Sequence, residues 1–228
     1  MTQPDVNAAV LWTGGKDSVL ALHEARQSGW HIRCLVTFAP PQPQFLAHPL
    51  EFMRLQAEAL GLRHVLWTVN EPFAESYEEG LRWLRTTENI HTVITGDIAE
   101  VGGSPNWIRE RSRPVGMNVL TPLWGRDRLT LLQQLLAAGY KVLFSCVKTR
   151  WLEAAWVGRE INDEAIASLR ALREVNGLDL CGEEGEYHTL VTDAPDFQRS
   201  IQLGTCHIRE RADLAYLEMT SLKLQDKP

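Results

Sequence analysis

The chain has 228 residues and a formal net charge of −6 at pH 7, which argues against a broad nucleic-acid-binding surface, because such a surface needs an excess of lysine and arginine. A hydrophobic fraction of 44% and a charged fraction of 23% are ordinary for a globular protein. The longest apolar runs span only a few residues, and residues 1–7 are polar. We therefore expect neither a signal peptide nor a membrane span.

The cysteines are isolated from one another. They stand at Cys34, Cys146, Cys181 and Cys206, with no Cys-x-x-Cys pair. This spacing argues against both a zinc site and a disulfide scaffold. We expect reduced thiols in a cytoplasmic protein.

Short apolar runs alternate with amphipathic stretches through the first half of the chain. The pattern predicts strands at 8–12, 32–38, 64–69 and 92–95, and helices at 18–28, 50–60 and 73–85. Such alternation is typical of a parallel α/β sheet with helices on both faces. Ligands of these sheets bind beyond the carboxyl ends of the strands.

The pattern changes after Leu123, where we place a domain boundary. The predicted elements around and after it are strands at 118–122 and 140–147, helices at 128–138 and 162–175, and an antiparallel ribbon of 200–209 with 214–224. Asp127 is suited to cap the first of these helices. We therefore expect one domain at 1–123 and a smaller α+β domain at 124–228.

A glycine loop between the first strand and the first helix is the most informative stretch. Its sequence is Thr13-Gly14-Gly15-Lys16-Asp17-Ser18. Adjacent glycines let the backbone approach a phosphate, and the first helical turn adds free N–H groups and the positive end of the dipole. Lys16 supplies a point charge, and Thr13 and Ser18 supply hydroxyls. The loop predicts a phosphate site, although a glycine turn that only starts a helix has the same residues.

Two other strand ends meet the same predicted edge, at Thr37-Phe38 and Gly96-Asp97. Asp97 is either a ligand of Mg²⁺ or a turn residue that accepts backbone hydrogen bonds. Three arginines follow, at Arg109, Arg111 and Arg113. Their alternate spacing on a short helix spreads them over more than one face, and one or two of them are placed to reach an anion.

Charged residues of the second half form the other candidate site. Lys148 ends a predicted strand and is either a phosphate ligand or a solvated lysine. Arg159 either pairs with residues near Glu160 or binds a carboxylate, for which its fork geometry is suited. Glu184, Glu186 and His188 would share one face if their segment is extended. A solvated charged loop is the alternative.

The order Thr-Gly-Gly-Lys-Asp-Ser resembles the SGGxDS loop of the N-type ATP pyrophosphatases, the PP-loop enzymes, with Thr13 where most members carry serine. Further stretches resemble one branch of that group, the diphthine–ammonia ligase family. These are Gly96-Asp97-Ile98, 122–127, Cys146-Val147-Lys148, Leu152, 158–161, 182–189 and Asp193-Ala194-Pro195. Their order and spacing extend from residue 8 to about residue 197.

The resemblance implies a Rossmann-like fold of the adenine nucleotide alpha-hydrolase type, with an ATP-binding domain at 1–123 and an acceptor-binding domain at 124–228. It implies a reaction in which ATP adenylates a carboxylate and ammonia displaces AMP. A carboxylate of the enzyme can hold ammonium and take its proton, since only ammonia is nucleophilic. The resemblance implies ATP contacts at Thr13, Gly14, Gly15, Lys16, Asp17, Ser18, Thr37, Phe38, Gly96 and Asp97, with Mg²⁺ held by Asp17 and Asp97. It implies catalytic roles for Lys16, Asp17, Lys148, Glu184 and Glu186, and acceptor contacts from Arg159, Glu184, Glu186 and His188.

The acceptor implied by the resemblance is a modified histidine, diphthine, on translation elongation factor 2. A bacterial member would have no diphthamide to make and would need another carboxylate. Two alternatives stay open: a PP-loop enzyme that modifies tRNA, which the absence of paired cysteines and the acidic balance disfavour, and a regulator that binds a nucleotide without turnover. Whether the chain forms a homodimer is also open.

Overall fold

The computed structural model describes residues 7–102 and 105–227. The chain folds into two compact units. Unit 1 contains the residues up to Thr13, 17–44 and 62–124, and unit 2 contains 14–16, 45–61 and 125–228. The expected division of labour between 1–123 and 124–228 stays a prediction about function. Within the described residues, no helix is long and apolar enough to cross a membrane.

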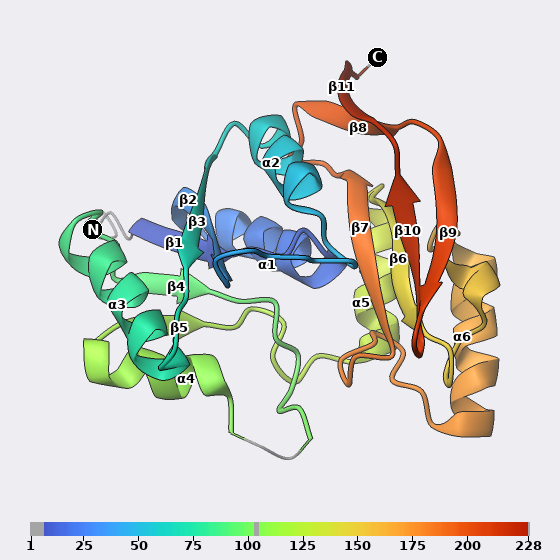
Figure 1. Cartoon of the computed structure of the whole chain (residues 1–228), viewed down its shortest axis with the longest axis horizontal. Helices are drawn as coiled ribbons and strands as arrows, with labels where there is room; N and C mark the ends of the chain where they lie inside the picture. The colour runs from blue at the N-terminus through green and yellow to red at the C-terminus, as the bar shows by residue number, and fades with distance from the viewer. Residues whose placement is uncertain (1–6, 103–104, 228) are drawn as a thin grey trace. The chain divides into compact units, whose positions relative to one another are not determined.

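A parallel sheet forms the centre of unit 1 (Figure 1). Its strand order is β3-β2-β1-β4-β5, with bounds Arg63–Thr68, His31–Ala39, Asn7–Leu11, Thr92–Ile94 and Asn118–Leu120. Every neighbouring pair in this sheet is parallel. The predicted fold class is therefore confirmed, and the loops that follow β1, β2 and β4 leave the sheet at the same edge.

The helices of unit 1 are α1 (Lys16–Gln27, of which Lys16 belongs to unit 2), α3 (Phe73–Thr86) and α4 (Trp107–Ser112), followed by the short η1 (Arg113–Val115). Ala9 of β1 packs in one apolar cluster with Leu81 and Leu84 of α3. Ala8 and Val10 point to the opposite face, because side chains alternate along a strand, and they are fully buried. Both faces of the strand are thus covered.

Helix α2 (Leu50–Ala59) was expected as a plain crossover between two parallel strands, but it belongs to unit 2. It packs against β8 (Arg199–Leu203) and β11 (Leu222–Asp226) of that unit. Two contacts fix its last turn, since Gln198 N donates to Ala59 O at 2.7 Å and Arg199 pairs with Glu58 at 2.7 Å. The helical spacing of apolar residues in the sequence predicts this helix, but it does not predict to which unit the helix belongs.

Unit 2 is built on an antiparallel sheet of order β7-β6-β10-β9, and this confirms the predicted α+β architecture (Figure 1). The strand bounds are Tyr187–Asp193, Lys141–Lys148, Leu214–Met219 and Cys206–Arg211. The helices α5 (Arg128–Ala137) and α6 (Asp163–Asn176) begin at capping residues: Asp127 accepts from Thr130 N and Asn162 from Ala165 N. The short η2 (Ala154–Trp156) precedes α6. Strand β7 was not predicted.

The expected ribbon is present, but each of its long runs is divided into two strands. β8 (Arg199–Leu203) pairs with β11 (Leu222–Asp226), and β9 pairs with β10. Between the pairs, Gly204 N donates to Ser221 O at 2.9 Å and Thr220 N donates to Thr205 O at 3.0 Å, so the ladder continues. A Cβ at Gly204 would lie 2.1 Å from Ser221 Oγ, which explains the glycine at this crossing.

Candidate functional site

The glycine loop contains residues of both units, with Thr13, Asp17 and Ser18 in unit 1 and 14–16 in unit 2. Helix α1 starts inside the loop, at Lys16. In unit 1, Thr13 Oγ1 lies 3.4 Å from Ser18 Oγ. The hydroxyls predicted from the sequence therefore lie together at the N-terminus of α1, where an anion is favoured.

Gly96, which follows β4, lies directly against the first turn of α1. A Cβ at this position would lie 2.5 Å from the carbonyl carbon of Asp17 and 2.7 Å from Ser18 N. Both neighbours are backbone atoms, so no side chain larger than hydrogen fits without moving the helix. The structure thus brings together the predicted residues Asp17, Ser18, Gly96 and Asp97 within unit 1.

Asp97 anchors the segment that leads to α4. Its Oδ2 accepts from Asn106 Nδ2 at 2.6 Å, and Asn106 Oδ1 in turn accepts from Arg109 N and caps α4. Burial, with a smaller contribution from the charge of Asp97, raises the pKa of Tyr77. The carboxylate therefore has a structural partner, and its predicted contact with a metal ion stays a prediction. The described residues contain no group of three or more His, Cys, Asp and Glu side chains that could hold a metal ion alone.

The side chains at the end of β2 take part in the fold. Thr37 Oγ1 donates to Trp12 O at 2.7 Å and is hydrogen-bonded to His64 Nε2 at 2.8 Å. The ring of Phe38 stacks on Tyr77 with centroids 3.8 Å apart. The ATP contact predicted at Thr37-Phe38 stays a prediction and would depend on backbone groups.

In unit 2 the glycine loop lies along β7, the strand at the edge of the antiparallel sheet. Val191 N donates to Gly14 O at 3.3 Å, and Lys16 N donates to Thr189 Oγ1 at 3.0 Å. Gln56 of α2 completes the contact, because its Nε2 donates to both Gly14 O and Val191 O at 2.9 Å. These bonds fix the backbone of the loop at the point where phosphate is expected.

Gln56 is fully buried, and its Oε1 points at Gly14, where a Cβ would lie only 2.1 Å away. We expect Gln56→Leu to lower the free energy of unfolding by about 1–3 kcal/mol, because it leaves buried carbonyl groups with fewer partners. Urea unfolding measures the change. Gln133→Leu, at an exposed position of α5, is the matched control. Equal stability of the two variants would contradict a role of Gln56 in holding the loop.

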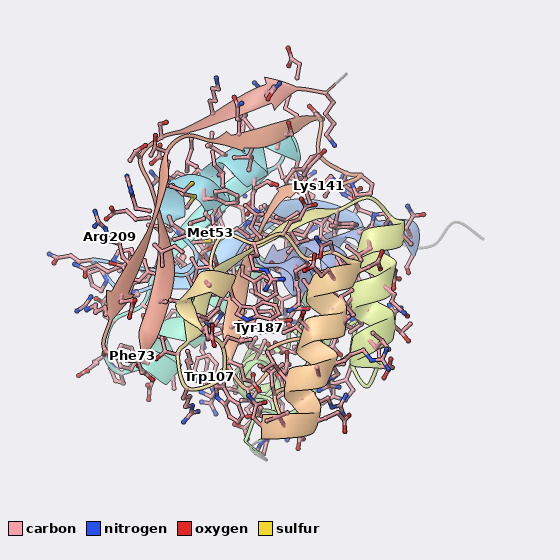
Figure 2. The ribbon with its side chains drawn as sticks, turned by 90° about the vertical axis from the view of Figure 1, so that its right-hand side faces the viewer. Met53, Phe73, Trp107, Lys141, Tyr187 and Arg209 are labelled. Carbon is pink, nitrogen blue, oxygen red and sulfur yellow. The ribbon has the colours of Figure 1, made fainter. Side chains whose placement is uncertain are left out.

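Lys16 is buried, with 2% of its surface exposed. Its Nζ donates to Cys181 O at 2.5 Å and lies 5.1 Å from the centroid of the Tyr187 ring, which Figure 2 labels. A buried ammonium needs such partners to offset the loss of water. The structure therefore brings the lysine of the glycine loop and the start of the acidic loop, residues 181–186, into one site of unit 2.

The acidic loop is bent, so the condition under which Glu184, Glu186 and His188 would share one face, an extended segment, is not met. Gly182 and Gly185 have φ values of +71° and +79°, which turn the backbone. Asp179 stabilises the turn, since its Oδ1 accepts from the N–H groups of Cys181 and Glu183, and its Oδ2 accepts from the Arg128 side chain.

The glutamates of this loop differ in environment. Glu184 is exposed, whereas Glu186 is 2% exposed. Glu186 Oε1 accepts from Asp179 N at 2.9 Å, and its Oε2 is buried with no hydrogen-bond partner among the described residues. Lys148 is adjacent to Glu186, because its backbone N–H donates to Glu186 O at 2.8 Å. Its Nζ lies close to Gly185, since a Cβ added at that glycine would be 3.1 Å from it. Lys148 and Glu186 are thus brought together as predicted site residues.

A histidine pair completes this side of unit 2. The rings of His48 and His188 meet edge to face, with centroids 5.3 Å apart. Desolvation, the neighbouring His188 and the charge of Lys16 lower the pKa of His48 to about 3. Desolvation, followed by the positive charges of Lys16 and Lys148, also lowers the pKa of His188, although this residue is exposed. Both rings are therefore neutral beside the two lysines at neutral pH.

Because the pKa of His48 falls from 6.5 in the unfolded chain to about 3 in the folded protein, the unfolded chain binds more protons between these values. The free energy of unfolding should therefore fall as the pH drops below 6.5, and this residue should contribute on the order of 2 kcal/mol of the loss by pH 5. We expect His48→Gln to flatten that part of a stability–pH curve. His207→Gln, at an exposed position of β9, should leave the slope unchanged. A stability–pH slope of His48→Gln equal to that of wild type would contradict the lowered pKa of His48.

Arg159, the predicted acceptor ligand, lies over an aromatic ring. Its guanidinium carbon is 4.3 Å from the centroid of Trp156, whose ring contacts Phe144 at 5.1 Å. Phe144 in turn lies 4.9 Å from Tyr187. A series of aromatic contacts thus leads from Arg159 to the ring beside Lys16, and the contact of Arg159 with an acceptor stays a prediction.

Gln56, Thr189 and His48 belong to the site, but sequence reasoning missed them. For Gln56 a signal was available, because it lies on the apolar face of α2 beside Phe52 and Met53. A polar side chain within an apolar stripe must find partners when it is buried. The other two carry no local signal, since only the packing of distant segments gives them their neighbours.

Both halves of the chain match a known family. Residues 6–119 match the diphthamide synthase N-terminal domain, and residues 127–223 match the diphthamide synthase C-terminal domain. The human protein named diphthine–ammonia ligase is 23% identical over 97% of this chain and 94% of its own length. The bovine protein of that name is 24% identical over the same shares.

Among solved structures, the chain is similar to one described as a predicted subunit of tRNA methyltransferase from Methanocaldococcus jannaschii. The sequence identity is 16% and the TM-score is 0.47, over 83% of this chain and 98% of the other. The family matches extend through both predicted halves of the chain, and they include the glycine loop and the acidic loop. The chain belongs to the diphthamide synthase family, as the resemblance of its motifs predicted.

Proposed function

We propose that the protein is an ATP-dependent amide ligase that adenylates a carboxylate and then transfers the acyl group to ammonia, releasing AMP and pyrophosphate. One observation carries the proposal: a glycine loop opens the first helix of a parallel sheet, and its lysine is hydrogen-bonded to the acidic loop. The loop proposed to bind phosphate is thus linked by a hydrogen bond to the loop proposed to bind ammonium. The names of the human and bovine relatives support the same reaction class.

In the first step, an oxygen of the acceptor carboxylate attacks the α-phosphorus of ATP, and the bond from that phosphorus to pyrophosphate breaks. Amides of Gly14 and Gly15 and the N-terminus of α1 suit the negative charge of the leaving pyrophosphate. Lys16 adds a positive charge at the same loop. The hydrogen bonds from Gln56, Thr189 and Val191 hold this loop before the nucleotide arrives.

Asp17 and Asp97 suit a Mg²⁺ ion that takes its other ligands from phosphates and water, which is the usual arrangement for this ion. The observation in favour is that Gly96 lies against the backbone of Asp17, so the two carboxylates belong to neighbouring backbone segments. When bound, the ion would neutralise phosphate charge. These two residues would hold it.

In the second step, the nitrogen of ammonia attacks the acyl carbon, the bond from that carbon to the AMP oxygen breaks, and the nitrogen loses a proton. Glu184 is exposed and suits capture of ammonium from solvent. The unpartnered Oε2 of Glu186 suits the role of proton acceptor. Lys148 lies beside the same loop and would stabilise the negative charge that develops on the acyl oxygen.

The acceptor in the relatives' name is diphthine, and we propose either that residue on a translation elongation factor or another carboxylate where diphthine is absent. Incubation with ATP, Mg²⁺, ammonia and candidate acceptors tests the reaction. We expect acceptor-dependent AMP and pyrophosphate in equal amounts. Formation of ADP and phosphate would contradict the proposal, and ATP binding without cleavage for every acceptor would identify a nucleotide-binding regulator instead.

A further inference from the structure

Unit 1 contains a pocket that the proposed chemistry has not used. Its volume is about 400 Å³, which is within the usual size range of small-molecule sites. The wall includes Glu100, which follows β4, residues of α4 and η1, and Trp124, which follows β5. We call it the α4 pocket. Its residues follow the carboxyl ends of parallel strands, where ligands of such sheets bind.

Arg109 is held in a fixed position in this wall. Its Nη2 donates to Thr121 Oγ1 at 2.7 Å, and its guanidinium carbon lies 4.7 Å from the centroid of the Trp124 ring. A guanidinium has five N–H donors, so a single bond to threonine leaves capacity for a carboxylate. The arginine is exposed, so its remaining edge is accessible. An ordered arginine loses less side-chain entropy when it binds a ligand.

The charges of the pocket select the class of anion. Arg111 is already paired with Glu78 at 2.9 Å, whereas Arg109 and Arg113 line the pocket together with the carboxylates Glu100 and Glu110. A ligand with several negative charges would be repelled by the glutamates. A monocarboxylate can place its charge on the arginines and keep the rest of its structure near Trp124.

The α4 pocket is connected to the predicted nucleotide residues by direct contacts within unit 1. Asn106, which lines the pocket, donates to Asp97 at 2.6 Å. Asp97 follows Gly96, and Gly96 lies against the first turn of α1. A carboxylate that is to attack an α-phosphate must be held close to these groups.

We propose that the α4 pocket binds the acceptor of the ligase reaction: Arg109 and Arg113 hold its carboxylate, and the Trp124 ring packs against a flat group next to it. This inference rests on the proposed function. It assigns the acceptor to unit 1, whereas the sequence had suggested Arg159 and the region 124–228.

The test is equilibrium binding by calorimetry. The probe is imidazolylbutanoate, a monocarboxylate with a flat ring, and its uncharged primary amide is the control compound. Wild type should bind the acid at least about tenfold more tightly than the amide. Arg109→Gln and Arg113→Gln should each weaken acid binding about 10- to 100-fold and leave ATP affinity unchanged. Arg82→Gln, at an exposed position of α3, should have no effect. Retained ATP affinity also shows that the variants are folded.

No measurable binding of the acid at millimolar concentration, equal binding of acid and amide, or full acid affinity in both pocket variants would overturn the inference. Weaker binding of pyrophosphate to Arg109→Gln and Arg113→Gln than to wild type would overturn it as well, because it would identify the pocket as a polyanion site. These outcomes are separate from a failure of the proposed function, which appears as absence of acceptor-dependent AMP and pyrophosphate in wild type.

Discussion

Lys16→Met should weaken ATP binding by about 10- to 100-fold and leave adenosine binding nearly unchanged. The lysine is the charged residue of the glycine loop, and a lost charge-assisted contact costs about 1.5–3 kcal/mol. Methionine keeps an apolar side chain of similar length at this buried position, where Lys16 is 2% exposed. The loss of ATP affinity in Lys16→Met should therefore come from removal of the ammonium group and not from a cavity in the protein interior.

Calorimetry with ATP, AMP and adenosine separates the contributions of the phosphates, since the loss should be greatest for ATP. The control is Lys141→Met, because the side chain of Lys141 is 61% exposed and pairs only at the surface with Glu160. This variant should bind ATP like wild type. Equal ATP affinity of Lys16→Met and wild type would exclude the lysine from the phosphate site.

The parallel sheet could be predicted because its signals are local. Apolar runs, glycine stops and strand–helix alternation gave the strands of unit 1 to within two residues. The glycine loop was equally accessible, since strand, glycines and helix are contiguous in the chain. The sequence signal at Gly96 was weaker. The reason for a glycine at this position is visible only in the structure, where a Cβ would meet the backbone of α1.

The assignment of α2 to unit 2 could not be predicted, because it depends on packing against strands far along the chain. Helix α2 has an apolar face that either unit could cover, and the hydrogen bonds of Gln56 are made to residues 42 and 135 positions away. No period in a single sequence carries such information. Strand β7 was missed for a related reason, since its fold depends on pairing with β6 and on the glycine loop at its free edge.

The acidic loop was identified as a candidate site from its residue types, but its shape was not. Alternation of charged residues predicts a shared face only in an extended segment. Here Gly182 and Gly185 take positive φ values, and Asp179 accepts backbone N–H groups from the turn. The result is one exposed glutamate and one buried glutamate, and this difference allows their roles to be separated by mutation.

Glu186→Gln should slow amide formation by roughly 10²–10⁴-fold, the usual cost of removing a general base, while ATP binding stays intact. The substitution conserves shape. Its Oε1 can still accept from Asp179 N, so the turn should persist, and only the unpartnered Oε2 is replaced by an amide that cannot take a proton. Adenylation precedes the ammonia step, so pyrophosphate release in a single turnover should be affected less than amide formation.

The measurement follows pyrophosphate and amide separately in a single turnover, with thermal unfolding of each variant recorded beside it. Glu184→Gln should raise the ammonia concentration required for half-maximal rate, because this glutamate is exposed and suited to capture ammonium. Glu210→Gln, at an exposed position of β9, should behave like wild type. If Glu186→Gln retains full amide synthesis, or if its only defect is a lower melting temperature, Glu186 supports the loop through Asp179 and does not accept the proton.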